Sequence, residues 1–170
     1  MLNKKDAKYI LKLDDDVFVH VGALLKFLKQ ELSQRDVKRL ILCDSITTLK
    51  VRRSWRSKWR VLPKEYPNKE YPTYCAGWAI LYTVDTVFLL YREAQKEPYF
   101  WIDDVHVTGT LAKKINLTHI SVNSMILSEY MMAILLKRQR IKKDFIFGPP
   151  NLMETGIRAL HNAVTTNIII

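Results

Sequence analysis

The sequence is poor in the residues that mark special structural classes. Five glycines and six prolines among 170 residues exclude collagen-like and low-complexity chains. The two cysteines, Cys43 and Cys75, are too few for a fold built on disulfides and lack the spacing of a zinc site. They could form one bridge or remain two buried thiols. The thiol interpretation is slightly favoured, because Cys43 directly follows the apolar residues 40–42.

Long apolar runs are also lacking. A membrane-spanning helix needs roughly 18 or more consecutive apolar residues, and no run in the sequence approaches that length. The first six residues carry charges without a following apolar stretch, which a secretory signal peptide would need. We therefore expect that the chain as written neither crosses a membrane nor opens with a signal peptide.

Acidic residues are outnumbered by basic ones, 17 against 27, which gives a formal net charge of +10. This excess predicts attraction to anions such as nucleic acid, anionic lipid or nucleotides, but it does not choose among them. Six cations and two tryptophans, Trp55 and Trp59, are concentrated in residues 50–60. This pattern is found in single-stranded nucleic-acid binders, in diphosphate sites and in solvated loops.

Apolar periodicity predicts alternating strands and helices, hence an α/β fold. The expected strands cover residues 8–13, 39–43, 75–82 and 120–127, and the expected helices cover residues 21–32, 84–94, 105–115 and part of the segment after 151. Thr83 is the expected N-cap of the second helix. The sequence suggests one α/β unit over residues 1–147 followed by a C-terminal tail, 148–170.

Three consecutive acids, Asp14, Asp15 and Asp16, follow the first predicted strand. Residues two apart on an extended chain project to the same side, so Asp14 and Asp16 could face one site. Carboxylate oxygens suit Mg²⁺ or Mn²⁺, which bridge to phosphate oxygens. The alternative is a solvated acidic turn or an acidic helix start.

A second acidic pair, Asp103 and Asp104, follows Trp101 just before a predicted helix. Such a pair could supply a general base in a partly dry cleft, or Asp103 could simply cap the helix. Farther upstream, Gly77 and Trp78 follow a tyrosine-rich segment. The glycine suggests that a ligand or backbone passes close by, although single aromatic residues of this kind are more often core.

Taken in order, these segments resemble the β-1,3-galactosyltransferase family, which includes β-1,3-N-acetylglucosaminyltransferases and is related to the fringe enzymes. The resemblance covers roughly residues 8–118. Its motifs are KLDDDVFVH at 12–20, KWRV at 58–61, YP at 66–67, YPTYCAG at 71–77 and IDDV at 102–105.

The resemblance implies the C-terminal portion of a GT-A glycosyltransferase fold, a mixed sheet flanked by helices, without the N-terminal nucleotide-binding units. It implies an inverting hexosyltransferase that moves galactose or N-acetylglucosamine from a UDP-sugar to a hydroxyl of a glycan on a glycoprotein or glycolipid. Asp14, Asp15 and Asp16 would form the nucleotide-binding DxD-type motif, with Asp16 and then Asp14 as ligands of Mn²⁺ or another divalent cation. Asp104 would be the catalytic base.

The resemblance further implies that Gly77, Trp78, Trp101 and Asp103 lie near substrate. It also implies a full-length form anchored in the Golgi membrane with its catalytic part on the luminal side. Nucleic acid is not expected as a partner, because acidic pairs repel phosphate unless a metal is present. The alternative is a non-catalytic, truncated or degenerate glycosyltransferase-like binding protein. One departure concerns the metal site, because no histidine follows the acidic pair at the family's usual distance and His161 lies farther along.

Overall fold

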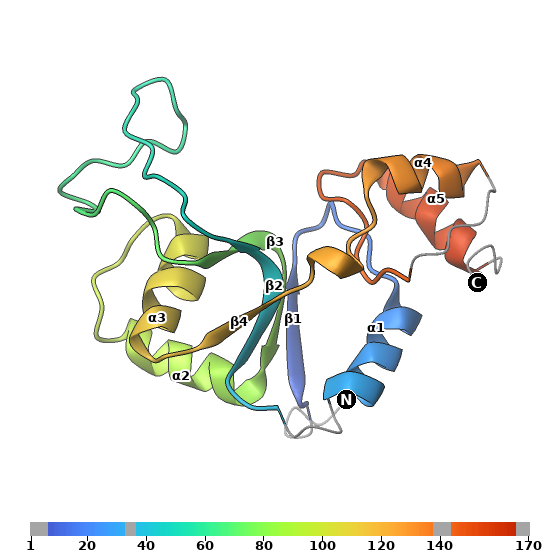
Figure 1. Ribbon diagram of the computed structural model, residues 1–170, viewed down its shortest axis with the longest axis horizontal. Coiled ribbons are helices and arrows are strands. Elements are labelled where there is room, and N and C mark those ends of the chain that lie inside the picture. Colours follow the sequence, from blue (N-terminus) through green and yellow to red (C-terminus); the bar gives the residue numbers. More distant parts are fainter. Residues whose placement is uncertain (1–6, 33–36, 138–143, 166–170) are drawn as a thin grey trace. The chain divides into compact units, whose positions relative to one another are not determined.

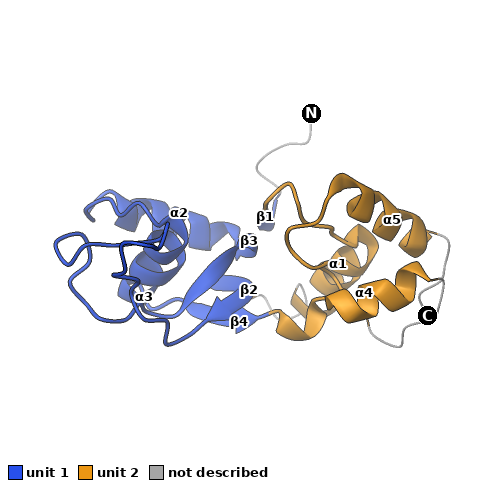
Figure 2. Cartoon of the chain, turned by 90° about the horizontal axis from the view of Figure 1, so that it is seen from above, with its two compact units in different colours: residues 1–11, 38–121 blue, residues 12–37, 122–170 orange. Residues whose placement is uncertain are grey.

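A computed structural model describes residues 7–32, 37–137 and 144–165 (Figure 1). These residues form an α/β fold in two compact units, 1–11 with 38–121 and 12–37 with 122–170 (Figure 2). The division differs from the expected break at residue 148, because segments distant in the sequence form the second unit together. None of the described helices is both long and apolar enough to cross a bilayer.

The sheet has four strands in the order β1-β3-β2-β4. They are β1 (Tyr9–Leu13), β2 (Leu40–Ile46), β3 (Tyr74–Thr83) and β4 (Thr118–Ser121). β2 pairs with β3 in antiparallel fashion and with β4 in parallel fashion, so the sheet is mixed, as expected. The fourth strand was predicted to reach Leu127, but a 3₁₀ turn follows at Asn123–Met125.

The helices of the first unit cover one face of this sheet. They are α2 (Val84–Ala94), a π-helix at Asp104–Leu111 and the short α3 (Ala112–Lys114) that continues it. Leu90 and Leu111 pack with Ile41, Ile80 and Tyr82 in one buried cluster. Thr83 lies at the predicted N-cap position of α2. Its hydroxyl, however, accepts a hydrogen bond from the Leu40 N–H and bonds to Thr86 Oγ1 instead of capping the helix.

The second unit has its own core, formed by Phe18, Phe145, Leu160 and their neighbours. Its helices are α1 (Val21–Phe27), which continues as a π-helix to Leu32, then α4 (Glu129–Leu136) and α5 (Glu154–Thr165). The Gly148 N–H donates to the Phe18 carbonyl (2.8 Å), which ties the segment after 147 to the segment after β1. Residues 148–165 are therefore part of this unit's core rather than a separate tail, and residues 166–170 lie outside the described residues.

The two cysteines form a disulfide, so the slight preference for free thiols was wrong. β2 and β3 are regularly paired at Cys43–Ile80 and again at Ser45–Cys75, with an irregularity between these two pairs. Residues 76–79 of β3 bulge out opposite the single residue Asp44 of β2. The bulge brings the Cα atoms of Cys43 and Cys75 to 5.6 Å, a usual separation for a disulfide.

Replacing both cysteines by alanine should destabilise the protein by about 3–4 kcal/mol, because the bridge closes a loop between residues 32 positions apart. Urea unfolding monitored by tryptophan fluorescence would measure the loss. Reduced wild-type protein should unfold at a midpoint close to that of the double variant. An unchanged midpoint after reduction would show that the bridge does not restrain the unfolded chain in this way.

Candidate active site

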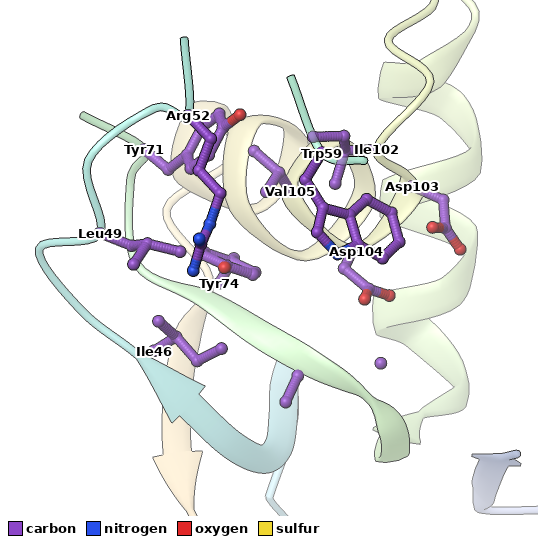
Figure 3. Close-up of a pocket in the computed structure, with 12 residues that line it drawn as sticks. Ile46, Leu49, Arg52, Trp59, Tyr71, Tyr74, Ile102, Asp103, Asp104 and Val105 are labelled. Atoms are coloured by element: carbon purple, nitrogen blue, oxygen red, sulfur yellow. The ribbon is translucent and has the colours of Figure 1, made fainter. Parts of the chain in front are cut away.

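The first unit contains a cavity of about 300 Å³ beside the bulge of β3 (Figure 3). Its polar lining includes Asp103 and Asp104 from the start of the π-helix, Arg52 from the segment between β2 and β3, and Tyr74 from β3. The remaining lining residues are Ile46, Leu49, Trp59, Tyr71, Ala76, Gly77, Ile102 and Val105. Two carboxylates, a guanidinium and aromatic rings therefore share one small space.

Asp104 lies directly against Gly77. A Cβ atom built on Gly77 would lie 2.2 Å from Asp104 Oδ1 and 2.5 Å from Oδ2, far inside van der Waals contact. The expected close approach at Gly77 is thus made by the Asp104 carboxylate. Any side chain at position 77 would displace this carboxylate.

Thr108 holds the helix of Asp104 against β3. Its buried hydroxyl donates to the Asp104 carbonyl (2.6 Å) and accepts from the N–H of Cys75 (2.8 Å). His119 of β4 bonds through Nε2 to the Thr108 carbonyl (2.6 Å). The backbone of Asp104 is thereby fixed to the disulfide-linked strand.

Asp103 does not cap the helix, so the structure contradicts the capping alternative for this residue. Its φ of −58° and ψ of −40° are already helical, and its side chain makes no capping hydrogen bond. The His106 N–H donates to the Ile102 carbonyl (2.9 Å), so helical hydrogen bonding begins before Asp103. Asp103 is exposed and lines the cavity beside Asp104.

A structured segment between β2 and β3 carries Arg52 and Trp59. The guanidinium of Arg53 donates to the carbonyls of Val61, Tyr66 and Asn68 at 2.6–2.9 Å, which folds this segment around one side chain. The ring of Trp59 is stacked on Trp101, with centroids 6.0 Å apart and planes 8° from parallel. Trp101 thus supports a ring that lines the cavity, whereas Trp78, half-buried on β3, is not among the lining residues.

Burial and the nearby carboxylates raise the pKa of two tyrosines, Tyr74 in the cavity lining and Tyr82 farther along β3. Burial raises the pKa of Tyr74; the Asp104 carboxylate raises it further, while Arg52 lowers it. Burial, and then the charges of Asp104 and Asp103, also raise the pKa of Tyr82. At neutral pH both phenols are therefore neutral.

The three aspartates after β1 belong to the second unit. The strand ends at Leu13 and the chain turns at Asp15 and Asp16, so the argument from strand alternation does not apply to this triplet. Lys12 Nζ lies 3.0 Å from Asp14 Oδ1 in an exposed ion pair. The Asp16 carbonyl accepts the Leu152 N–H (2.9 Å), which fixes the turn to the segment before α5.

Within residues 7–32, 37–137 and 144–165, no three His, Cys, Asp or Glu side chains are gathered so that they could hold a metal ion. His161, on α5, therefore does not complete such a group with the aspartates. Their oxygens are nevertheless the donor type that Mg²⁺ and Mn²⁺ prefer. These ions commonly keep several water molecules and take further ligands from substrate phosphates. The donor set fits a metal held jointly with a nucleotide.

The sequence indicated Asp104, Asp103 and Gly77, and the structure brings these three together. The sequence did not identify three further residues of the cavity lining, Arg52, Trp59 and Tyr74. They lie in segments that were already suspected of ligand binding, but their spacing did not distinguish them from their neighbours. Thr108 was not suspected at all. A threonine four residues after Asp104 in a predicted helix was the available signal, because its hydroxyl can reach the carbonyl four residues back.

The site thus combines a mixed-sheet α/β fold with a pair of aspartates at the start of a helix. The family model described as "Galactosyltransferase" matches residues 2–123, so the chain belongs to the galactosyltransferase family.

Curated relatives agree with this assignment. The chain is 35% identical over 101 residues to a human acetylgalactosaminyl-O-glycosyl-glycoprotein β-1,3-N-acetylglucosaminyltransferase, a match that covers 59% of the chain and 26% of that protein. It is 30% identical over 112 residues to mouse β-1,3-galactosyltransferase 1, covering 65% of the chain and 33% of the relative. It is 27% identical over 111 residues to chimpanzee β-1,3-galactosyltransferase 5, covering 65% and 36%. The chain therefore spans about a quarter to a third of the length of these relatives.

Gly77→Ala should lower the free energy of unfolding by roughly 1–3 kcal/mol, because the new methyl group overlaps the Asp104 carboxylate. Gly156→Ala in α5 is the matched control. There the nearest atom would lie 3.5 Å away, and alanine favours a helix by roughly 1 kcal/mol. Thermal unfolding should show opposite shifts for the two variants. Equal shifts would contradict the close packing of Gly77 against Asp104.

Proposed function

We propose that the protein acts in inverting glycosyl transfer from a UDP-sugar to a glycan hydroxyl, with Asp104 as the general base. The observation that carries this proposal is the Asp104 carboxylate in a cavity lined by aromatic rings, in a chain of the galactosyltransferase family. The relatives are named as β-1,3-galactosyl- and β-1,3-N-acetylglucosaminyltransferases, so the donor would be UDP-galactose or UDP-N-acetylglucosamine.

In the proposed reaction the acceptor hydroxyl gives its proton to the Asp104 carboxylate. The acceptor oxygen forms a bond to the anomeric carbon from the face opposite UDP. The bond between that carbon and the phosphate oxygen breaks, and its electron pair leaves on UDP. General-base assistance of this kind contributes roughly 10²–10⁴-fold. Trp59, supported by Trp101, would offer an apolar face to a sugar ring.

The proposed metal site consists of Asp16 and then Asp14, with Asp15 near the nucleotide. A divalent ion such as Mn²⁺ would offset negative charge on the diphosphate leaving group. Asp14 is already paired with Lys12. Asp16 is thus the residue from which we expect the larger contribution.

We also propose a full-length form that is membrane-anchored and works on the luminal side of the Golgi. The Cys43–Cys75 disulfide supports this location, since disulfides persist in the oxidising secretory compartments. A non-catalytic glycosyltransferase-like binding protein is the second candidate.

Asp104→Asn should reduce UDP release by roughly 10²-fold or more, because an amide cannot accept the proton. Asp103→Asn is the matched control: it removes the same charge from the same cavity and should retain most activity. The assay measures UDP release from either UDP-sugar with a β-linked sugar acceptor, together with UDP affinity for each variant.

Three outcomes of this assay would contradict parts of the proposal. If Asp103→Asn were inactive and Asp104→Asn active, Asp103 rather than Asp104 would be the general base. If neither substitution affected UDP release, the mechanism would be wrong. If the wild-type chain bound UDP and acceptor without releasing UDP, the binding protein would be favoured.

Asp16→Asn should weaken the affinity for UDP in the presence of Mn²⁺, and Asp14→Asn should weaken it less, because Lys12 already engages Asp14. Isothermal titration calorimetry, with and without Mn²⁺, would measure both effects. Identical UDP affinities for wild type and Asp16→Asn would show that Asp16 does not contribute to nucleotide binding, which would contradict the proposed metal site.

A further inference from the structure

Arg52 is the one cation among the residues that line the Asp104 cavity. In the described part of the chain its guanidinium has no hydrogen bond or ion pair, although its carbonyl accepts the Val61 N–H (2.9 Å). The neighbouring Arg53 is different, because its guanidinium donates hydrogen bonds to three carbonyls of the same segment. Arg53 therefore builds the segment, and Arg52 is left to face the cavity.

The charges in the cavity are separated. Arg52 and Tyr74 lie on one side, and Asp103 and Asp104 lie on the other (Figure 3). The opposite effects of Arg52 and Asp104 on the pKa of Tyr74 show that both charges act on this phenol. A ligand whose reacting hydroxyl lies at Asp104 would thus present its far side toward Arg52.

A guanidinium binds carboxylate and sulfate groups through paired N–H donors. The two aspartates lining the same cavity oppose a multiply charged group such as a diphosphate, whereas a singly charged group at the Arg52 side can be accommodated. The volume of about 300 Å³ is at the lower end of ligand pockets, which suits a sugar unit.

We propose that Arg52 makes this site selective for acceptor sugars that carry one negative charge, a uronate or a sulfate ester. The proposal rests on the proposed function in assigning the cavity to the acceptor. Arg52 would be a specificity-determining residue that binds the anionic group, while Asp104 receives the proton of the hydroxyl.

The test compares two probes that differ only at one carbon, methyl β-galactopyranoside and methyl β-galactopyranosiduronic acid. Their affinities for the 170-residue chain would be measured by NMR titration at low salt. We expect the uronide to bind roughly 10-fold more tightly. The expected preference is smaller than for a buried arginine, because Arg52 is exposed and water screens its charge. This preference should shrink as salt is added.

Arg52→Gln should abolish the preference, and Arg52→Lys should restore part of it, since lysine keeps the charge but not the paired donors. Arg56→Gln is the matched control. It removes the same charge from the same segment. Arg56, however, does not line the cavity, and its Cζ atom lies over the Trp55 ring, 5.0 Å from the ring centroid. The control should keep the preference of the wild type.

Equal binding of the two probes to wild type, or loss of the preference in Arg56→Gln, would overturn the proposal. A fall in Mn²⁺-UDP affinity in Arg52→Gln with unchanged sugar binding would overturn it too, because Arg52 would then hold the donor diphosphate. Failure of the transfer reaction is a separate result. A uronide preference that depends on Arg52 in a chain with no UDP release would support the anion site and contradict only the catalytic role.

Discussion

The irregular pairing of β2 with β3 is the constraint on which the candidate site depends. Four residues of β3 oppose a single residue of β2, and the bulge includes Gly77. A regular ladder would continue the side-chain alternation of β3 through this region, whereas the bulge breaks it and re-aims the strand. The Cys43–Cys75 bridge spans the bulge, because it links β2 on one side of the irregularity to β3 on the other, so the two strands cannot easily slip in register.

The bulge of β3 and the π-helix are packed and hydrogen-bonded to each other. The Asp104 carboxylate occupies the space that a side chain at position 77 would fill, and the Thr108 hydroxyl joins the helix to Cys75 at the start of the bulge. A buried hydroxyl with both a donor and an acceptor partner gives directional attachment that apolar packing alone does not provide. The position of the carboxylate is therefore set by backbone geometry on two elements. This preorganisation is what a general base needs.

Local sequence patterns predicted β1 and β3 well from short apolar or partly alternating runs, and α2 from its helical spacing after Thr83. They failed for α4 (Glu129–Leu136), whose nearly continuous apolar composition has no helical period to detect. The disulfide and the division into two units depend on contacts between distant segments, such as the pairing of Val19 with Phe147. A cap at Asp103 was a reasonable alternative from its residue type, but the helical turn already begins at Ile102, and residue types do not show such boundaries.

The acidic pair of the cavity is easier to predict from the sequence than the residues around it. An acidic pair before a helix is a compact signal, whereas Arg52 is one of six cations in an eleven-residue segment, and its neighbour has a purely structural role. The two arginines can be told apart only in the folded segment. There Arg53 donates hydrogen bonds to three carbonyls, whereas Arg52 lines the cavity. The net charge of the chain thus says little about the ligand. What matters is which single cation shares a cavity with the Asp104 carboxylate.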